Sequence, residues 1–136
     1  MQEITKVALD AMGGDNAPME IVKGAINAVN SRKDIKVFLV GQEDAIKEEL
    51  AKYSYPADQI EVVHASEVIE MAEPPVVAIR RKKDSSMVVA MKMVRDGLAD
   101  AFVSAGSSGA ILVGGQTIVG RIKGIKRPPL APIIPT

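Results

Sequence analysis

Short apolar runs alternate with segments of helical periodicity along this chain. Four of the runs predict short strands, at residues 4–9, 36–40, 60–64 and 101–105. The second run is apolar at every position from Val37 to Val40, which is typical of a strand buried on both faces. Strands that alternate with helices predict right-handed crossovers and a parallel sheet, with ligand sites at the carboxyl ends of the strands. We therefore expect a doubly wound α/β domain with helices on both faces of the sheet.

Two helices are predicted between the first three strands. The first, over residues 18–30, has an apolar face that consists of Ile21, Val22, Ala25, Ile26 and Val29. The second, over residues 42–52, is expected to be exposed. Its charged side chains stand four positions apart and predict two ion pairs, Glu43 with Lys47 and Glu48 with Lys52.

The turn after the first strand has the composition of an anion site. Gly13 and Gly14 allow positive φ and carry no Cβ, so backbone N–H groups can approach a ligand closely. Asp15 or Asn16 can cap the following helix, and Pro18 suits its first turn. Unpaired amides and the helix dipole then point the same way. The sequence GGDNAP is neither a GxGxxG fingerprint nor a Walker A loop, so an ordinary strand-to-helix turn is the alternative.

A second small-residue turn, SAGSSGA, follows the last predicted strand. Gly106 and Gly109 bracket Ser107 and Ser108 at a helix start, where hydroxyls and backbone N–H groups can donate to phosphate oxygens. The alternative is that these serines only cap the helix. The uncharged stretch 101–120 is long enough to span a bilayer, but its serines and glycines predict a strand, a turn and a close-packed helix instead.

The longest irregular stretch is predicted from Ala65 to Lys83, and it ends in four consecutive cations, Arg80 to Lys83. Loops of this length tend to be functional. The cations come just before a helix predicted to open at Asp84 and to stop at Gly97, so they reinforce the positive potential of its N-terminus. A solvated basic turn is the alternative. The inward face of that helix is better explained as core filling than as a cofactor site, and it consists of Met87, Val88, Met91 and Val94.

Composition narrows the class of protein. Seventeen basic and seventeen acidic residues leave no net charge and aromatic residues are only 3%, so we expect no nucleic-acid partner. Without cysteine there is no disulfide, thiolate nucleophile or zinc–thiolate site, which fits a reducing compartment. The first residues, MQEITKVALD, do not predict a secretion leader. His64 is expected to be a hydrogen-bonded structural residue rather than a base, and no metal site is predicted.

Four motifs stand out along the chain. They are VALDAMGGDNAP (residues 7–18), EPPVVAIRRKKDSSM (73–87), SAGSSGA (104–110) and IVGRIKGIKRPPLAP (118–132). In this order and spacing they resemble the PlsX family, the bacterial phosphate acyltransferases of phospholipid synthesis, over nearly the whole chain. The resemblance implies an isocitrate dehydrogenase-like fold, similar in architecture to that of phosphotransacetylases.

The chain departs from the family pattern in two respects. Family members usually have Asn and Thr where this chain has Ser107 and Ser108, which keeps the hydrogen-bonding capacity but changes its reach. Family members are also considerably longer. We therefore interpret residues 1–136 as a single α/β domain that forms the first half of the family fold, and the proline-rich stretch 123–136 as a connection to a second half.

The resemblance implies that a fatty acyl group moves from acyl-acyl carrier protein to inorganic phosphate, with no cofactor. The acyl phosphate then passes to a membrane glycerol-phosphate acyltransferase. A homodimer, a cytoplasmic location and peripheral association with the membrane are implied in the same way. Two alternatives stay open, a phosphotransacetylase-like enzyme or related dehydrogenase, and a non-catalytic module that binds a phospho-ligand or the carrier.

This chemistry needs positioning more than a reactive side chain. With no cysteine and no evident serine–histidine pair, we predict direct attack by a phosphate oxygen on the thioester carbonyl. The candidate catalytic residues are Asp10, Asp15 and Asn16, although the two aspartates can instead fix the loop. The two small-residue turns are expected to meet at one phosphate pocket. The candidate phosphate and substrate ligands are Gly13, Gly14, Arg81, Lys82, Lys83, Ser104, Gly106, Ser107, Ser108 and Gly109.

Overall fold

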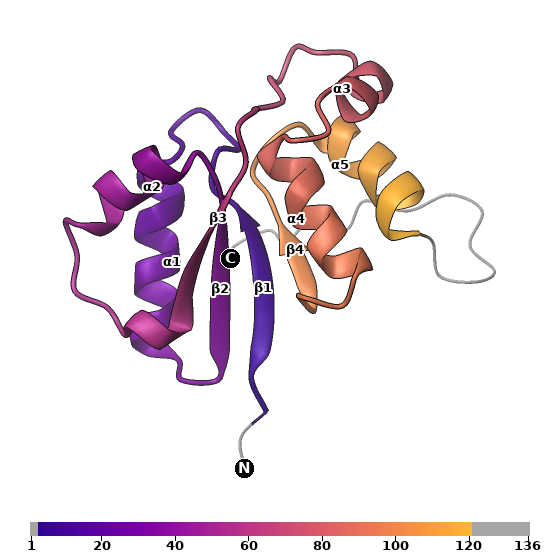
Figure 1. Cartoon of the computed structure of the whole chain (residues 1–136). Helices are drawn as coiled ribbons and strands as arrows, with labels where there is room; N and C mark the ends of the chain where they lie inside the picture. The colour runs from indigo at the N-terminus through magenta and orange to yellow at the C-terminus, as the bar shows by residue number, and fades with distance from the viewer. Residues whose placement is uncertain (1–2, 121–136) are drawn as a thin grey trace, which may run out of the picture.

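The computed structural model describes residues 3–120 and shows a four-stranded parallel sheet in the order β3-β2-β1-β4 (Figure 1). The strands are β1 (Thr5–Asp10), β2 (Ile35–Gly41), β3 (Ile60–His64) and β4 (Ala101–Val103). The α/β class and the four predicted strands are confirmed. β4 ends two residues earlier than expected, because from Ser104 onward the chain turns toward β1, where Ser104 Oγ donates to Asp10.

The register brings the carboxyl ends of the strands to one edge of the sheet. Leu9 pairs with Leu39 on one side and with Val103 on the other. The strand order reverses at β1, since β2 and β3 lie on one side of it and β4 on the other. In open α/β sheets, ligands bind outside the carboxyl ends of the strands at such a point.

Helices cover both faces of the sheet, as expected for a doubly wound fold. α1 (Met19–Ser31) and α2 (Glu43–Leu50) lie on one face, and α4 (Ser86–Arg95) lies on the other (Figure 1). β2 contributes to both layers: Val37 and Leu39 pack on the α1 side, whereas Phe38 and Val40 pack on the α4 side. Its continuous apolar run is therefore explained by burial on both faces, as predicted. The predicted apolar face of α1 also lies in this core, where the buried residues are Val22, Ala25, Ile26 and Val29.

A third apolar cluster forms where α3 (Pro75–Arg81) and α5 (Ser108–Gly114) pack beside α4. The α4 methionines Met87 and Met91 are buried in it, which confirms their role as core residues. α3 and α5 approach so closely that a Cβ on Gly109 would lie 2.8 Å from Pro75 Cγ. Two short helices complete the described residues, the 3-10 helix η1 (Ala57–Gln59) and the π-helix η2 (Gly115–Val119).

Some details of the predicted elements are wrong. Residues 65–83 are not irregular throughout, because Pro75 suits the first position of a helix and α3 buries its Ala78 and Ile79. The expected Glu43–Lys47 ion pair is present at 2.6 Å, but Lys52 lies beyond the end of α2 and pairs with Glu49 instead of Glu48, at 3.0 Å. α2 is also not simply exposed, since it buries Ile46 and Leu50.

No helix within residues 3–120 has the length and apolarity needed to cross a membrane. The uncharged stretch 101–120 folds as β4, a turn, α5 and η2, which confirms the predicted strand, turn and helix. The proline-rich stretch 123–136, predicted as a connection, lies outside the described residues.

Candidate functional site

The two small-residue turns lie against each other at the carboxyl ends of β1 and β4. A Cβ on Gly13 would lie 2.9 Å from the backbone nitrogen of Gly106 and 2.8 Å from Asp10 Oδ2. A Cβ on Gly14 would lie 3.4 Å from Ala105 Cβ, and Gly14 itself has a φ of 95°. Only glycine fits Gly13 without a shift of its neighbours. The backbones of the two turns therefore meet at the point where the strand order of the sheet reverses, as the sequence leads us to expect.

The carboxylate of Asp10, at the end of β1, connects these two turns through hydrogen bonds. The side chain is only 2% exposed, and its carboxylate accepts three hydrogen bonds. Oδ1 accepts from Ser86 Oγ at 2.5 Å and from the Met12 N–H at 3.1 Å, and Oδ2 accepts from Ser104 Oγ at 2.8 Å. Ser104 Oγ in turn accepts from the Gly106 N–H at 3.0 Å. A buried carboxylate with this many donors is well satisfied, which favours a role for Asp10 in fixing the loops.

The caps expected of Asp15 and Asn16 are wrong. Both residues are exposed, and α1 begins after Pro18 without a side-chain cap. Asn16 contributes only its backbone carbonyl, which accepts from the Glu20 N–H at 3.1 Å. Their side chains are therefore free to face solvent or a ligand beside the Gly13 turn.

In the second turn, Ser107 is a helix cap and Ser108 is not. Ser107 is buried, and its Oγ accepts from the Ala110 N–H at 3.2 Å at the start of α5. The capping alternative is thus correct for Ser107. Ser108 is exposed at the first position of α5. The Gly106 N–H already donates to Ser104, so this amide is not free for an anion.

The basic segment does not act as one cluster. Arg80 and Arg81 belong to the last turn of α3, where cations interact favourably with the helix dipole. Lys82 Nζ bonds to Glu73 Oε2 and to the Val68 carbonyl oxygen, both at 2.7 Å. Lys82 therefore closes the loop that carries α3. Its bond to Glu73 is also the main reason why the pKa of Glu73 lies below its ordinary value. Among residues 3–120, no ion pair includes Arg81 or Lys83, and both side chains are exposed.

His64 has the structural role that was expected. Its Nδ1 accepts from the Glu43 N–H at 3.2 Å, at the beginning of α2. Gln42, the capping residue of that helix, makes no side-chain cap. The histidine thus satisfies a backbone donor that would otherwise be unpaired.

Sequence reasoning missed Ser86, which it interpreted only as part of a helix start. The signal that was available is the pair Ser85–Ser86, since a helix needs only one cap. Asp84, the residue before this pair, has a lowered pKa, first because the Ser66 hydroxyl donates to it and then because the Ser66 N–H does. Asp84 thus joins the start of α4 to the segment after β3, and Ser86 joins it to the end of β1.

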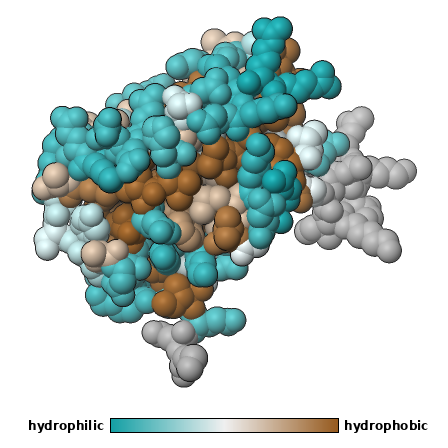
Figure 2. Space-filling model, viewed as in Figure 1, coloured by the Kyte–Doolittle hydropathy of each residue, from teal (hydrophilic) through white to brown (hydrophobic). Residues whose placement is uncertain are grey.

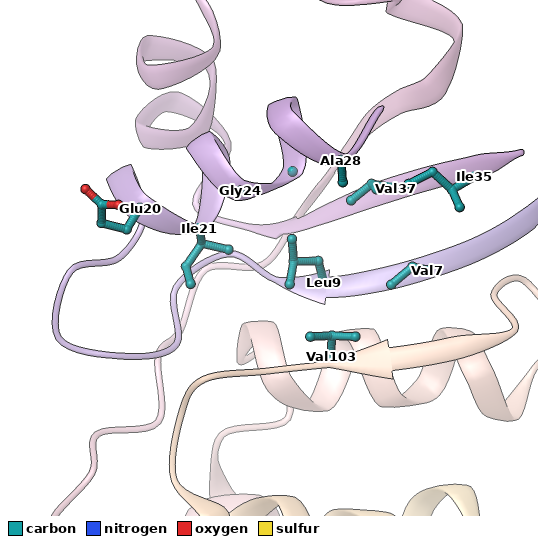
Figure 3. Close-up of a pocket in the computed structure, with 10 residues that line it drawn as sticks. Val7, Leu9, Glu20, Ile21, Gly24, Ala28, Ile35, Val37 and Val103 are labelled. Atoms are coloured by element: carbon teal, nitrogen blue, oxygen red, sulfur yellow. The ribbon is translucent and has the colours of Figure 1, made fainter. Parts of the chain in front are cut away.

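An apolar groove of about 330 Å³ lies on the α1 side of the sheet, and Figure 3 shows the side chains that line it. Apart from Glu20, the side chains at its wall are apolar and include Val7, Leu9, Ile21, Ala28, Val37 and Val103. Figure 2 shows further hydrophobic surface in the middle of the face that is turned to the viewer. A wall of this kind offers no donors to phosphate, so the groove is chemically distinct from the two turns. Within residues 3–120, no cluster of three or more His, Cys, Asp and Glu side chains forms a cation site.

Comparison with known proteins places the chain in a family. The family described as "fatty acid synthesis protein" matches residues 5–136. The chain belongs to this family. It is 55% identical over 131 residues to a phosphate acyltransferase of Alkaliphilus oremlandii, and 52% identical over 130 residues to one of Clostridium beijerinckii. Each match covers 96% of the chain.

The resemblance drawn from the four motifs is thereby confirmed. The chain spans 39% of the length of each of these two relatives, in agreement with the expectation that members of the fatty acid synthesis protein family are longer. The matched region includes both small-residue turns and the segment between them.

Proposed function

We propose that this chain is part of an acyltransferase of phospholipid synthesis that moves a fatty acyl group from acyl-acyl carrier protein to inorganic phosphate. The main observation in favour is the contact between the Gly13 and Gly106 turns at the strand reversal. Backbone N–H groups at this position suit a tetrahedral dianion. Within residues 3–120, the N–H groups of Gly13 and Gly14 donate to no protein acceptor, so they are available for a ligand.

The reaction joins a phosphate oxygen to the thioester carbonyl carbon, and the C–S bond breaks. The products are an acyl phosphate and the carrier thiolate, which takes up a proton from solvent. The thiolate is a good leaving group, so correct placement of phosphate and stabilisation of the developing oxyanion can lower most of the barrier. We assign these tasks to the N–H groups of Gly13, Gly14, Ser108 and Gly109, with the Ser108 hydroxyl as an additional donor.

We assign the carrier protein to the exposed side of α3. Val76 and Val77 are 51% and 44% exposed, and Arg80 and Arg81 lie four residues after them on the same side of the helix. Lys83 adds an exposed cation next to this surface. Apolar contact surrounded by cations suits an acidic partner, with charge governing the rate of encounter. The roles suggested for Arg81 and Lys83 are kept in this proposal, whereas Lys82 is assigned to the loop.

The test is phosphate-dependent release of free thiol from acyl-carrier thioester. The 136-residue chain and the longer A. oremlandii relative are assayed side by side, with phosphate omitted as the control. Phosphate-dependent release by both supports the proposal. Release from short acyl-coenzyme A but not from the carrier thioester would favour a phosphotransacetylase-like enzyme instead.

A second candidate function is a non-catalytic module that binds the carrier or a phospho-ligand. It is favoured by the fact that the chain spans only 39% of its relatives. Binding of carrier or phosphate without thiol release by the 136-residue chain would identify it.

The proposal extends to the biological setting. The acyl phosphate would pass to a membrane glycerol-phosphate acyltransferase, and the protein would act in the cytoplasm as a homodimer that associates peripherally with the membrane. Light scattering during size-exclusion chromatography tests the homodimer, and a monomer at micromolar concentration would contradict it.

A further inference from the structure

Two consecutive serines begin α4, and the structure gives them different tasks. Ser85 and Ser86 are 0% and 1% exposed. Ser85 is the helix cap, because its Oγ accepts from the Val88 N–H at 3.2 Å. Ser86 makes no cap. Its hydroxyl donates instead to Asp10 Oδ1, on β1, at 2.5 Å and across 76 positions of sequence.

This bond completes a hydrogen-bond network that connects both small-residue turns. Ser86 donates to Asp10 Oδ1, which also accepts from the Met12 N–H of the first turn. On the other side of the carboxylate, Asp10 Oδ2 accepts from Ser104 Oγ, which in turn accepts from the Gly106 N–H of the second turn. No buried side-chain polar atom within residues 3–120 lacks a hydrogen-bond partner, so the side chains of this network are satisfied by one another and by the nearby backbone.

The position of the carboxylate matters because Gly13 lies directly against it. The place of a Cβ on Gly13 is only 2.8 Å from Asp10 Oδ2 and 2.9 Å from Ser104 Oγ. A rotation of the carboxylate would therefore displace the Gly13 turn, the Ser104 hydroxyl, or both. A shift of a fraction of an ångström in groups that position a reacting anion is enough to reduce its binding.

We infer that Ser86 is a positioning residue for the phosphate site. By donating to Asp10 it fixes the rotation of the carboxylate, which in turn sets the spacing between the Gly13 and Gly106 turns. This inference rests on the proposed function for the identity of the anion. It concerns Ser86, whose hydroxyl bonds within residues 3–120 to Asp10 and to neither turn, so that it acts through Asp10.

The experiment compares two neighbouring serines that are equally buried. Ser86→Ala removes the bond to Asp10, and the matched control Ser85→Ala removes a helix cap. We expect Ser86→Ala to raise the KM for phosphate about tenfold. Ser85→Ala should lower the Tm but change this KM by less than about twofold, because a lost cap weakens the helix without moving Asp10.

A double-mutant cycle tests whether Ser86 acts through Asp10. Asp10→Asn keeps the shape of the side chain and removes its charge, and it should raise the KM for phosphate at least as much as Ser86→Ala does. Because the two residues belong to one chain of contacts, the double variant should be no worse than Asp10→Asn alone. Ser86→Thr, which keeps a hydroxyl, should have a KM closer to that of the unaltered protein than Ser86→Ala has.

The inference is wrong if Ser86→Ala and Ser85→Ala lower the Tm alike and both leave the KM for phosphate unchanged, or if the effects of Ser86→Ala and Asp10→Asn simply add. Should Ser86→Ala not fold, Asp10→Asn is compared with Ser85→Ala on the same criteria. Phosphate binding measured by calorimetry separates this inference from the proposed function. If the unaltered protein binds phosphate without releasing thiol, the proposed function fails while loss of binding in Ser86→Ala still supports the inference. If it does neither, both are overturned.

Discussion

The network around Asp10 and the basic segment Arg80–Lys83 differ in how their polar groups are satisfied. Asp10 is buried, and its carboxylate accepts from three protein donors. Within residues 3–120, Lys82 is the one member of the basic segment with such partners, whereas Arg81 and Lys83 are exposed. The comparison teaches that the charged groups which hold the loops, Asp10 and Lys82, are different from the exposed cations to which we assign the carrier protein.

The largest effect is expected from a substitution that disturbs the contact between the Gly13 and Gly106 turns. Gly13→Ala places a Cβ within 2.9 Å of Asp10, Ser104 and Gly106, so these groups must move. We expect phosphate-dependent thiol release to fall by more than about 100-fold, since misplacement of this kind is costly to catalysis. Gly24→Ala in α1 is the control. Its Cβ would meet nothing within 4 Å, and the change should stabilise the fold by about 0.5–1 kcal/mol. Equal activity in the two variants would show that the contact between the turns is not needed for the reaction.

Two exposed cations of the basic segment, Arg81 and Lys83, give the next largest effect. Arg81→Ala/Lys83→Ala should weaken binding of the acidic carrier about tenfold at low salt and reduce the salt dependence of binding. The Tm should change by less than about 1 °C, because surface changes without buried partners are nearly neutral. Carrier affinity at two salt concentrations and a thermal melt provide the measurements. A large loss of Tm with unchanged affinity would mean that Arg81 and Lys83 are structural.

Lys82 is expected to show the opposite behaviour. Lys82→Ala removes the bonds to Glu73 and to the Val68 carbonyl, which close the loop that carries α3. We expect the Tm to fall by roughly 3 °C, with carrier affinity changed less than in the Arg81/Lys83 variant. Lys82→Met, which keeps the length of the side chain, distinguishes loss of charge from loss of packing. If Lys82→Ala weakens carrier binding as much as the double variant does, Lys82 also meets the ligand.

The smallest effect is a pH dependence of stability. The pKa of Glu73 lies below its ordinary value of 4.5, first because of the Lys82 bond and then because of the Glu70 N–H. The folded protein thus holds this proton more weakly than the unfolded chain, so the stabilisation is present above 4.5 and is lost as pH falls below it. A series of melts from about pH 5.5 to about pH 3 should show a smaller decrease of Tm for Lys82→Ala than for the unaltered protein. Parallel curves would show that the ion pair contributes nothing to stability.

Local pattern was sufficient for the elements of the fold and for part of the site. β3 matches its predicted residues, and α1 and α4 bury the faces that their periodicity indicated. The proximity of the Gly13 and Gly106 turns followed from a general rule about parallel sheets. The rule could not identify which polar side chain would bond to which. The pairing of Lys82 with Glu73 and the capping role of Ser107 were missed or left open for this reason.

What the sequence determined by itself is therefore what short-range chemistry controls: strands, helices, the glycines of the turns, and motifs specific enough to indicate the family. The tertiary structure decided which of these groups meet. Ser86 reaches Asp10 across 76 positions and Ser104 reaches it across 94. Such contacts depend on the strand order β3-β2-β1-β4, which places β4 beside β1 and lays α4 over the sheet. A hydroxyl has the same composition and local propensity whether it caps a helix or holds a buried carboxylate, and only the packing of distant segments distinguishes the two.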